Sequence, residues 1–173
     1  MEFERLLLTR QSCRNYQEKP VDEETLRKIA ELAHLAPSAC NAQPWKIYAA
    51  TGAKAKEVAH ALQGMGMNKF TEKCPAFFAI AEGKTSFIGK VGGASHLVPY
   101  DVGIFAAHIV LAAQSLGVGS CIIGWRNEKT LQRVLGLKDK QCIPLVIALG
   151  YPAEDDPLRQ KRRKPLEEVF EIL

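Results

Sequence analysis

The most constraining feature of this sequence is a long apolar helix predicted from Val102 to Leu116. Asp101 is predicted to be its N-cap, and Gly117 closes it. Residues on nearly every side of this helix are apolar, whereas a helix on a protein surface keeps one polar face. The helix must therefore lie at the centre of the domain or at a subunit interface. Because it is shorter than the ~20 residues of a membrane helix, we expect a soluble protein with no membrane partner.

Helices and short strands are mixed irregularly along the rest of the chain. Apolar runs of strand length predict strands at Trp45–Thr51, Ala76–Ala81, Ser120–Ile123 and Ile143–Leu149. Periodicity and capping residues predict helices at Glu2–Thr9, from Asp22 to the stop at Pro37, at Lys54–Leu62 and at Glu128–Leu135. Residues 83–99 hold four glycines and Pro99 and are expected to be irregular. This mixture favours an α+β sandwich with a small central sheet.

The length and the cysteines limit the class of protein. With 173 residues, no internal repeat and no linker, residues 1–173 are predicted to form a single domain. The five cysteines are scattered, and neither they nor the four histidines have the spacing of a metal site. An odd, scattered set of cysteines favours a reducing compartment, and the first residues do not resemble a secretory signal. We therefore expect a cytoplasmic protein without a bound metal.

Nucleotide-binding fingerprints are missing from the sequence, but a strong cluster of positive charge is present. Neither GxGxxG nor GxxxxGK[ST] occurs, so a nicotinamide donor would have to bind outside a Rossmann crevice. Residues 159–164 (RQKRRK) hold five cations in six residues. Such a run is usually a solvated tail, sometimes a nucleic-acid patch, and a small phosphate ligand is the third possibility. Because no aromatic residue interleaves with the cations, we expect no nucleic-acid binding.

A second set of phosphate-binding candidates follows the first predicted helix. Arg10, Ser12 and Arg14 alternate in sequence, so an extended backbone would place them on one face. Guanidinium groups match the oxygens of a phosphate, and a hydroxyl adds a third donor. Alternatively, the two arginines could satisfy the last carbonyl groups of the helix.

Two further segments can contact a flat ring. The loop 37–45 (PSACNAQPW) has small side chains that allow close approach, and the Asn41 amide can donate and accept hydrogen bonds at a ring edge. A predicted strand also ends at Ile123-Gly124, where a glycine N–H could face a ring nitrogen. Taken alone, the first segment is an ordinary turn-rich loop and the second a turn glycine.

Taken together and in this order, the segments resemble the nitroreductase-like family of FMN-dependent NAD(P)H oxidoreductases. The resemblance covers almost the whole chain through RQSCRNY, APSACNAQPW, YDVGIFAAHIVLAAQSLGVGSC and KRRKPLEEV. It implies an α+β sandwich whose small central sheet is mixed, mainly antiparallel and flanked by helices. It also implies an intertwined homodimer with FMN bound non-covalently at the subunit interface, and residues 165–173 extending over the partner subunit.

The resemblance assigns cofactor-binding roles to particular residues of this sequence. For the FMN phosphate and ribityl chain it implies Arg10, Gln11, Ser12, Arg14, Lys161 and Arg163. For the ring it implies the other subunit's Pro37, Ser38, Ala39 and Asn41, together with Ile123, Gly124 and, near the pyrimidine, Thr71. Cys40 lies within this flavin-proximal loop, either as a small filler or as a group that modulates the flavin.

The activity implied is hydride transfer from NADH or NADPH through FMN to a small electrophilic acceptor, such as a nitroaromatic or a quinone. The chemistry would occur at FMN N5, and no side chain is assigned as a catalytic acid or base. The segment from Lys84 to Pro99 is short beside the lids of larger relatives, which leaves the substrate side open or differently built. The alternatives are a specialised flavin branch, such as a dehydrogenase, a dehalogenase or a flavin-modifying enzyme, and a flavin-binding module without catalysis.

Overall fold

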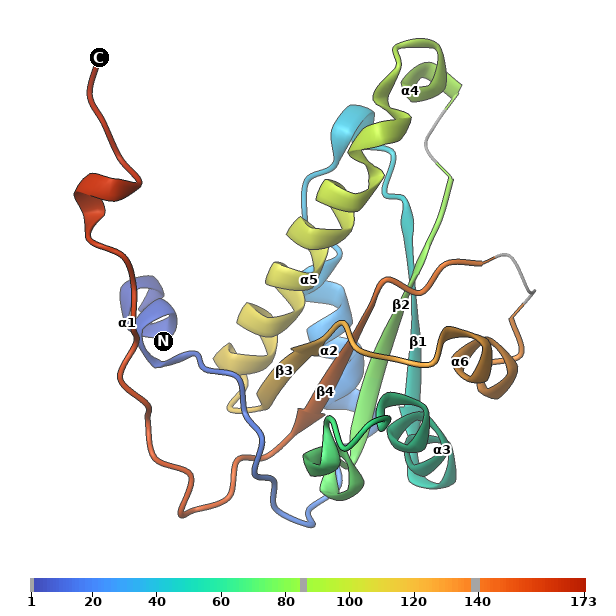
Figure 1. The fold of residues 1–173 in the computed structure, drawn as a ribbon, viewed down its shortest axis with the longest axis vertical. Helices are drawn as coiled ribbons and strands as arrows, with labels where there is room; N and C mark the ends of the chain where they lie inside the picture. The colour runs from blue at the N-terminus through green and yellow to red at the C-terminus, as the bar shows by residue number, and fades with distance from the viewer. Residues whose placement is uncertain (1, 85–86, 138–140) are drawn as a thin grey trace.

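A four-stranded sheet forms the centre of the computed structural model, which describes residues 2–84, 87–137 and 141–173. The strands have the order β1-β2-β4-β3, and every neighbouring pair is antiparallel (Figure 1). Their bounds are β1 (Trp45–Thr51), β2 (Ala76–Glu82), β3 (Gly119–Ile123) and β4 (Leu145–Gly150). The expected α+β class is therefore confirmed. The sheet itself is antiparallel rather than mixed, and parallel pairing is seen at an isolated bridge between Ser12 and Ser120.

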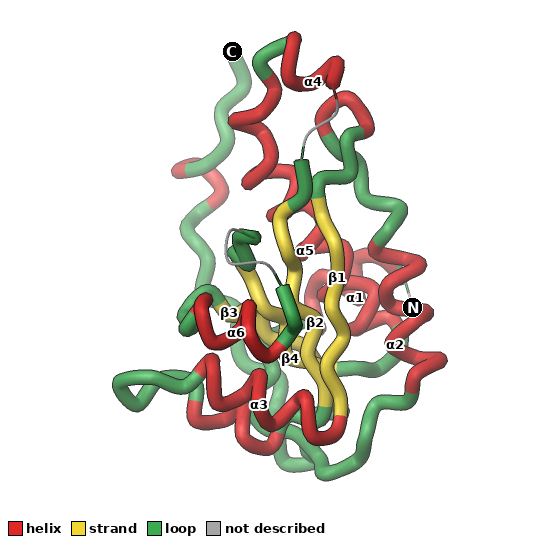
Figure 2. The backbone as a smooth tube through the Cα atoms, turned by 90° about the vertical axis from the view of Figure 1, so that its right-hand side faces the viewer, coloured by secondary structure: helices red, strands yellow, loops and turns green. Residues whose placement is uncertain are grey.

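Helices cover both faces of the sheet. The helices are α1 (Phe3–Thr9), α2 (Glu23–Ala33), α3 (Gly52–Leu62), α4 (Phe87–Val91), α5 (Val98–Ser115) and α6 (Glu128–Val134). Short 3-10 turns are η1 (Ala39–Asn41), η2 (Lys69–Lys73), η3 (Ala94–Leu97) and η4 (Leu166–Glu168). Helices α2 and α5 pack on one face, and α3 and α6 pack on the other, which faces the viewer in Figure 2.

Strand β2 explains why the chain needs two helix layers. Its residues from Ala76 to Ala81 are all buried, as expected for a strand that is covered on both faces. Successive side chains of a strand point to opposite faces, so Phe77 enters the core under α3 and Phe78 enters the core under α2 and α5.

Two of the predicted helix caps, at Asp22 and Asn127, are present in the structure. The Asp22 carboxylate accepts a hydrogen bond from Thr25 N at 2.7 Å, and the hydrogen bonds from Thr25 lower the pKa of Asp22. The Asn127 side chain likewise accepts from Thr130 N at 3.0 Å at the start of α6. Strand β4 begins at Leu145, two residues later than predicted, although Ile143 is fully buried.

The predicted start of α5 was wrong. The helix begins at Val98 instead of Val102, with Pro99 in its first turn, where the missing N–H of a proline carries no cost. Asp101 is consequently inside the helix and 5% exposed, and its carboxylate accepts a hydrogen bond from Ala39 N at 3.0 Å. The segment expected to be irregular contains α4 and η3, while residues 85–86 of it lie outside the described residues.

One side of α5 packs on α2 and the sheet, and the other side is exposed and apolar. Tyr100, Gly103, Ile104 and Ala107 lie on this exposed side. In the described part of the chain, Ser95–Ser115 is the one helical stretch long and apolar enough to cross a membrane by length and composition. Its inner side belongs to the core of the domain, which is what a soluble fold requires of such a helix.

The last nine residues leave the body of the molecule. We call residues 165–173 the C-terminal arm; Figure 1 shows it running away from α1 and the sheet. It exposes several large apolar side chains, namely Leu166, Val169, Phe170, Ile172 and Leu173. These side chains form an exposed apolar surface outside the core of the domain.

Candidate functional site

The two basic segments of the sequence meet in one cleft. Residues Arg10, Gln11 and Ser12 face residues 159–163 across an open cleft of about 340 Å³, which we call the basic cleft. The first segment leaves α1 and runs beside the free edge of β3, where Cys13 N donates to Ser120 O at 2.9 Å. The structure thus brings together five residues predicted to bind the phosphate group: Arg10, Gln11, Ser12, Lys161 and Arg163.

Hydrogen bonds hold the basic run against the first segment. The Gln11 side chain donates to Pro157 O at 3.1 Å and accepts from Arg159 N at 2.9 Å. Arg159 Nη2 donates to Ser12 O at 2.8 Å, and Lys161 Nζ donates to Arg10 O at 2.7 Å. The run is therefore an ordered wall of the cleft and not a solvated tail.

The cleft concentrates positive charge that acids of the described chain neutralise only in part. Arg159 is paired with Asp156 at 2.6 Å, but Arg10, Lys161 and Arg163 form no ion pair among the described residues. Partial desolvation lowers the pKa of Lys161, and the nearby charges of Arg10 and Arg163 lower it further. Like charges held together in this way favour an anion between them.

Arg14 lies apart from this cluster. Its guanidinium carbon is 5.9 Å from the centroid of the Phe70 ring, which is a cation–π contact, and it does not line the cleft. The alternation of Arg10, Ser12 and Arg14 predicted one shared face. Two residues further on, Tyr16 pairs with Pro152 and is buried, with its hydroxyl donating to Cys13 O at 2.8 Å.

The end of β3 offers an open glycine. Ile123 is buried, whereas Gly124 is exposed. The φ of Gly124 is not positive, and a Cβ added to it would meet no atom within 4 Å, so the packing of this chain does not require a glycine there. From Ser120, beside the basic cleft, to Gly124 the strand extends roughly 13 Å at 3.3 Å per residue. A ligand with an anionic end and a flat end could span this edge.

The loop 37–43 does not line the basic cleft. It contacts α4 and η3, at the end of the molecule away from α1 (Figure 1). Ser38 Oγ accepts from Gln43 N at 2.9 Å, and Asp101 holds Ala39 as described above. Pro37, Cys40 and Asn41 are exposed. A single chain therefore does not bring Pro37, Ser38, Ala39 and Asn41 to the basic cleft, as expected if a second subunit supplies them.

Thr71 takes part in a turn of its own chain. It is fully buried in η2, and its hydroxyl donates to Asn68 O at 2.7 Å and accepts from Gln63 Nε2 at 3.1 Å. These bonds use the hydroxyl to close the turn, and the contact of Thr71 with the pyrimidine ring stays a prediction.

Three of the cysteines are structural. Burial raises the pKa of Cys13 to about 11 and that of Cys74 to about 12, and it also raises the pKa of Cys121. These thiols are therefore protonated near neutral pH and fill the core. In the described ranges no group of three potential ligands could hold a metal ion.

Sequence reasoning missed two residues that support the site. Arg159 anchors the basic run, as described, and Arg126 Nη1 donates to Gly124 O at 2.7 Å. Both donate to backbone carbonyl groups; Arg159 belongs to the basic run but was given no role of its own, and no motif pointed to Arg126. The position of Arg126 directly after the Gly124 turn was the available signal.

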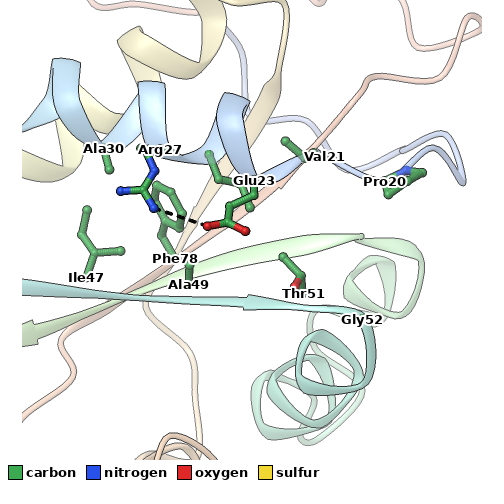
Figure 3. Close-up of a pocket in the computed structure, with 11 residues that line it drawn as sticks. Pro20, Val21, Glu23, Arg27, Ala30, Ile47, Ala49, Thr51, Gly52 and Phe78 are labelled. Atoms are coloured by element: carbon green, nitrogen blue, oxygen red, sulfur yellow. Dashed lines mark hydrogen bonds and ion pairs between the residues drawn. The ribbon is translucent and has the colours of Figure 1, made fainter.

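A larger groove lies on the other edge of the sheet. It measures about 660 Å³ and runs between α2 and the edge strand β1, with Leu26, Ile47 and Phe78 among its apolar walls. Figure 3 shows the ion pair between Arg27 and Glu23, 3.3 Å long, at its mouth. It contains none of the predicted phosphate-binding or ring-binding residues.

Comparison with known proteins identifies the family. The model of the nitroreductase family matches residues 7–151. The chain is 31% identical to an NADH dehydrogenase of Thermus thermophilus over 94% of this chain and 91% of the relative. A nitroreductase family protein of Streptococcus pneumoniae superposes with a TM-score of 0.80 at 26% identity, covering 99% of this chain and 100% of that one. The FMN-dependent nitroreductase NfnB of Mycobacterium smegmatis, in complex with NADPH, superposes with a TM-score of 0.79 at 22% identity, covering 98% and 97%. The chain therefore belongs to the nitroreductase family of oxidoreductases.

Proposed function

We propose that this protein binds FMN non-covalently and transfers hydride from NADH or NADPH to a small electrophilic acceptor, such as a nitroaromatic or a quinone. The observation that carries the proposal is the basic cleft at one end of β3 and the open Gly124 at the other end. The similarity in fold to an FMN-dependent nitroreductase in complex with NADPH supports it.

The residues of the cleft fit the FMN phosphate. Arg10, Lys161 and Arg163 would neutralise its charge, and Ser12 could donate a hydrogen bond. The ribityl chain would then follow β3, and the ring would lie by Ile123 and Gly124. When bound, FMN supplies the hydride-transfer chemistry, while the protein orients the reactants. No side chain of the described site is assigned to move a proton.

A homodimer would complete this site. Because the loop 37–43 lies away from the basic cleft of its own chain, Ser38, Ala39 and Asn41 can reach a ring beside β3 only from another subunit. The exposed side of α5 supports this arrangement. Gly103 costs the helix about 1 kcal/mol relative to alanine, and nothing in its own chain lies within 4 Å of its missing side chain. A close approach by a partner helix would account for that glycine.

The C-terminal arm supplies the second part of the proposed dimer. We propose that the arm of one subunit lies in the groove between α2 and β1 of its partner. The unpaired edge of β1 can accept an extended segment, and the apolar walls of the groove suit Phe170 and Ile172. The arm also carries three acidic residues, Glu167, Glu168 and Glu171. Their negative charges would complement the positive charges of the exposed Arg27 and Lys46 beside the groove.

The direct test is spectroscopic. Purified protein should show the absorption of bound flavin, NADH or NADPH should bleach it under anaerobic conditions, and a nitroaromatic or a quinone should restore it. Protein that is colourless and cannot be reconstituted with FMN would contradict the proposal. Flavin that is reoxidised by oxygen alone, with no competing acceptor, would instead indicate a flavin-binding module without this activity.

Gly124 provides a sharper test of where the ring lies. In the flavin-free protein, Gly124→Val should leave the melting temperature unchanged, because the chain leaves space for the side chain. The same side chain should weaken FMN binding by about 5- to 150-fold, as expected for overpacking of 1–3 kcal/mol. Fluorescence titration and thermal melts measure the two effects. Unchanged FMN affinity would place the ring away from Gly124.

A further inference from the structure

A second pocket begins at the residue after Gly124. It measures about 530 Å³ and lies between the end of α3 and the start of α6, lined by Ala61, Gln63, Gly64 and residues 125–129. The Trp125 side chain forms one wall and is about half exposed. A Cβ on Gly64 would be 3.3 Å from Trp125 Nε1, so this glycine lets the indole lie close to α3. The pocket therefore combines a flat aromatic wall with the turn that follows β3.

The charge in this pocket is positive. Arg126 and Lys129 line it together with Glu128. Glu128 Oε1 accepts a hydrogen bond from Ile143 N at 2.7 Å and is 3.9 Å from Arg126 Nη2. The carboxylate of Glu128 is therefore shared between the backbone and Arg126. Lys129 forms no ion pair within the described ranges.

Arg126 has hydrogen-bond donors to spare. A guanidinium has five N–H donors. Nη1 donates to Gly124 O at 2.7 Å, and Nε is buried without a partner among the described residues. The remaining Nη donors can bind an anion while Nη1 keeps its contact with Gly124. The guanidinium is thus fixed beside the residue at which we place the ring edge.

We infer that this pocket is a subsite for the carboxylate group of an aromatic acid that serves as the acceptor. The inference rests on the proposed function, because it places the acceptor on the flavin beside Gly124. The planar guanidinium of Arg126 matches a carboxylate, Lys129 adds a second positive charge, and the Trp125 indole offers a flat wall for the aromatic ring. Negatively charged aromatic acceptors are then favoured over neutral ones of the same size.

The position of the pocket favours the acceptor over the donor. A carboxylate attached directly to a small aromatic ring can reach Arg126 while that ring lies by Gly124. The phosphates of NADH and NADPH are separated from the nicotinamide by a ribose, so they fall farther from the same point. Binding of a donor phosphate in this pocket is the competing outcome of the test.

The test compares 4-nitrobenzoate with the neutral 4-nitrobenzamide as acceptors. In each two-electron turnover NADH and a proton convert the nitro group to a nitroso group and water, and NADH becomes NAD⁺. The readout is the ratio of the kcat/KM values for the two acceptors in each variant. The intrinsic reactivity of each acceptor is the same whichever variant reduces it. A change in this ratio between variants therefore reports recognition of the carboxylate.

Arg126→Gln should lower the ratio about tenfold or more, which is the effect of losing a hydrogen bond between charged groups. Arg126→Lys should lower it less, and Lys129→Gln should lower it by a few-fold, as expected for an exposed charge. The matched control is Lys54→Gln, which removes an exposed lysine of α3 outside the pocket and should leave the ratio unchanged.

The outcomes separate this inference from the proposed function. A ratio unchanged in both Arg126→Lys and Lys129→Gln would overturn the subsite, and these two variants decide the question if Arg126→Gln fails to fold. An unchanged ratio with a raised KM for NADPH or NADH would assign the pocket to the donor and likewise overturn the inference. Wild-type protein that holds no FMN, or reduces neither acceptor, would contradict the proposed function itself.

Discussion

Replacing Arg10 by alanine should weaken FMN binding by roughly 10- to 150-fold, the effect of losing a charged hydrogen bond of about 1.5–3 kcal/mol. Arg10 lines the basic cleft with Lys161 and Arg163, and no described acid neutralises these three cations. Removing one of them takes away a direct partner of the phosphate. Titration of the flavin-free protein with FMN, followed by the quenching of flavin fluorescence, measures the change.

Arg5→Ala is the matched control for this prediction, because Arg5 is an exposed arginine on α1 that does not line the cleft. It should bind FMN like the wild type. Arg14→Ala should cause a smaller loss than Arg10→Ala, since the Arg14 guanidinium lies over Phe70. Equal FMN affinity in Arg10→Ala and the wild type would mean that the phosphate is held elsewhere.

Replacing Phe78 by alanine should lower the free energy of unfolding by about 3–5 kcal/mol. Phe78 is 1% exposed and extends from β2 into the core shared with α2 and α5. It also forms part of the floor of the groove between α2 and β1 (Figure 3). Truncation would therefore leave a cavity under two helices at once. Urea denaturation of the flavin-free protein measures the loss.

Leu35→Ala controls for the loss of apolar surface alone. Leu35 is 76% exposed, so its truncation should change the free energy of unfolding by no more than about 0.5 kcal/mol. A loss below 1 kcal/mol for Phe78→Ala would show that the core beneath α2 is not packed as described.

Local signals in the sequence predicted most of the fold. The carboxylate of Asp22 and the side chain of Asn127 cap helices where they were expected, and the apolar run at β2 is buried on both faces. The predicted start of α5 was wrong because Asp101 was taken as its N-cap and Pro99 as part of the irregular segment, although the first turn of a helix tolerates proline. Whether the sheet is mixed or antiparallel depends on long-range pairing, which no local pattern encodes.

The meeting of the two basic segments could be predicted from the resemblance to the family. Arg10, Lys161 and Arg163 are cations, and the structure brings them to one cleft. The residue type of Thr71 is ambiguous, because a hydroxyl can serve a ligand or a turn equally well, and in the structure it closes η2. Arg126 was missed because its partner is the backbone carbonyl group of Gly124. Every residue has a backbone carbonyl group, so the sequence does not indicate which one a side chain will contact.

The basic cleft is built from parts of the chain that are synthesised far apart in time. Gln11 pairs with Pro157 and Arg159, Arg10 pairs with Lys161, and the last of these contacts spans 151 positions. On the ribosome, the sheet and α5 can therefore be synthesised before the second wall of the cleft, residues 159–163, has emerged. The cofactor can be captured only when the final segment has emerged, and a protease cut near Leu158 would remove one wall of the cleft together with the C-terminal arm. Bound FMN would in turn hold the two ends of the fold together and protect that exposed segment.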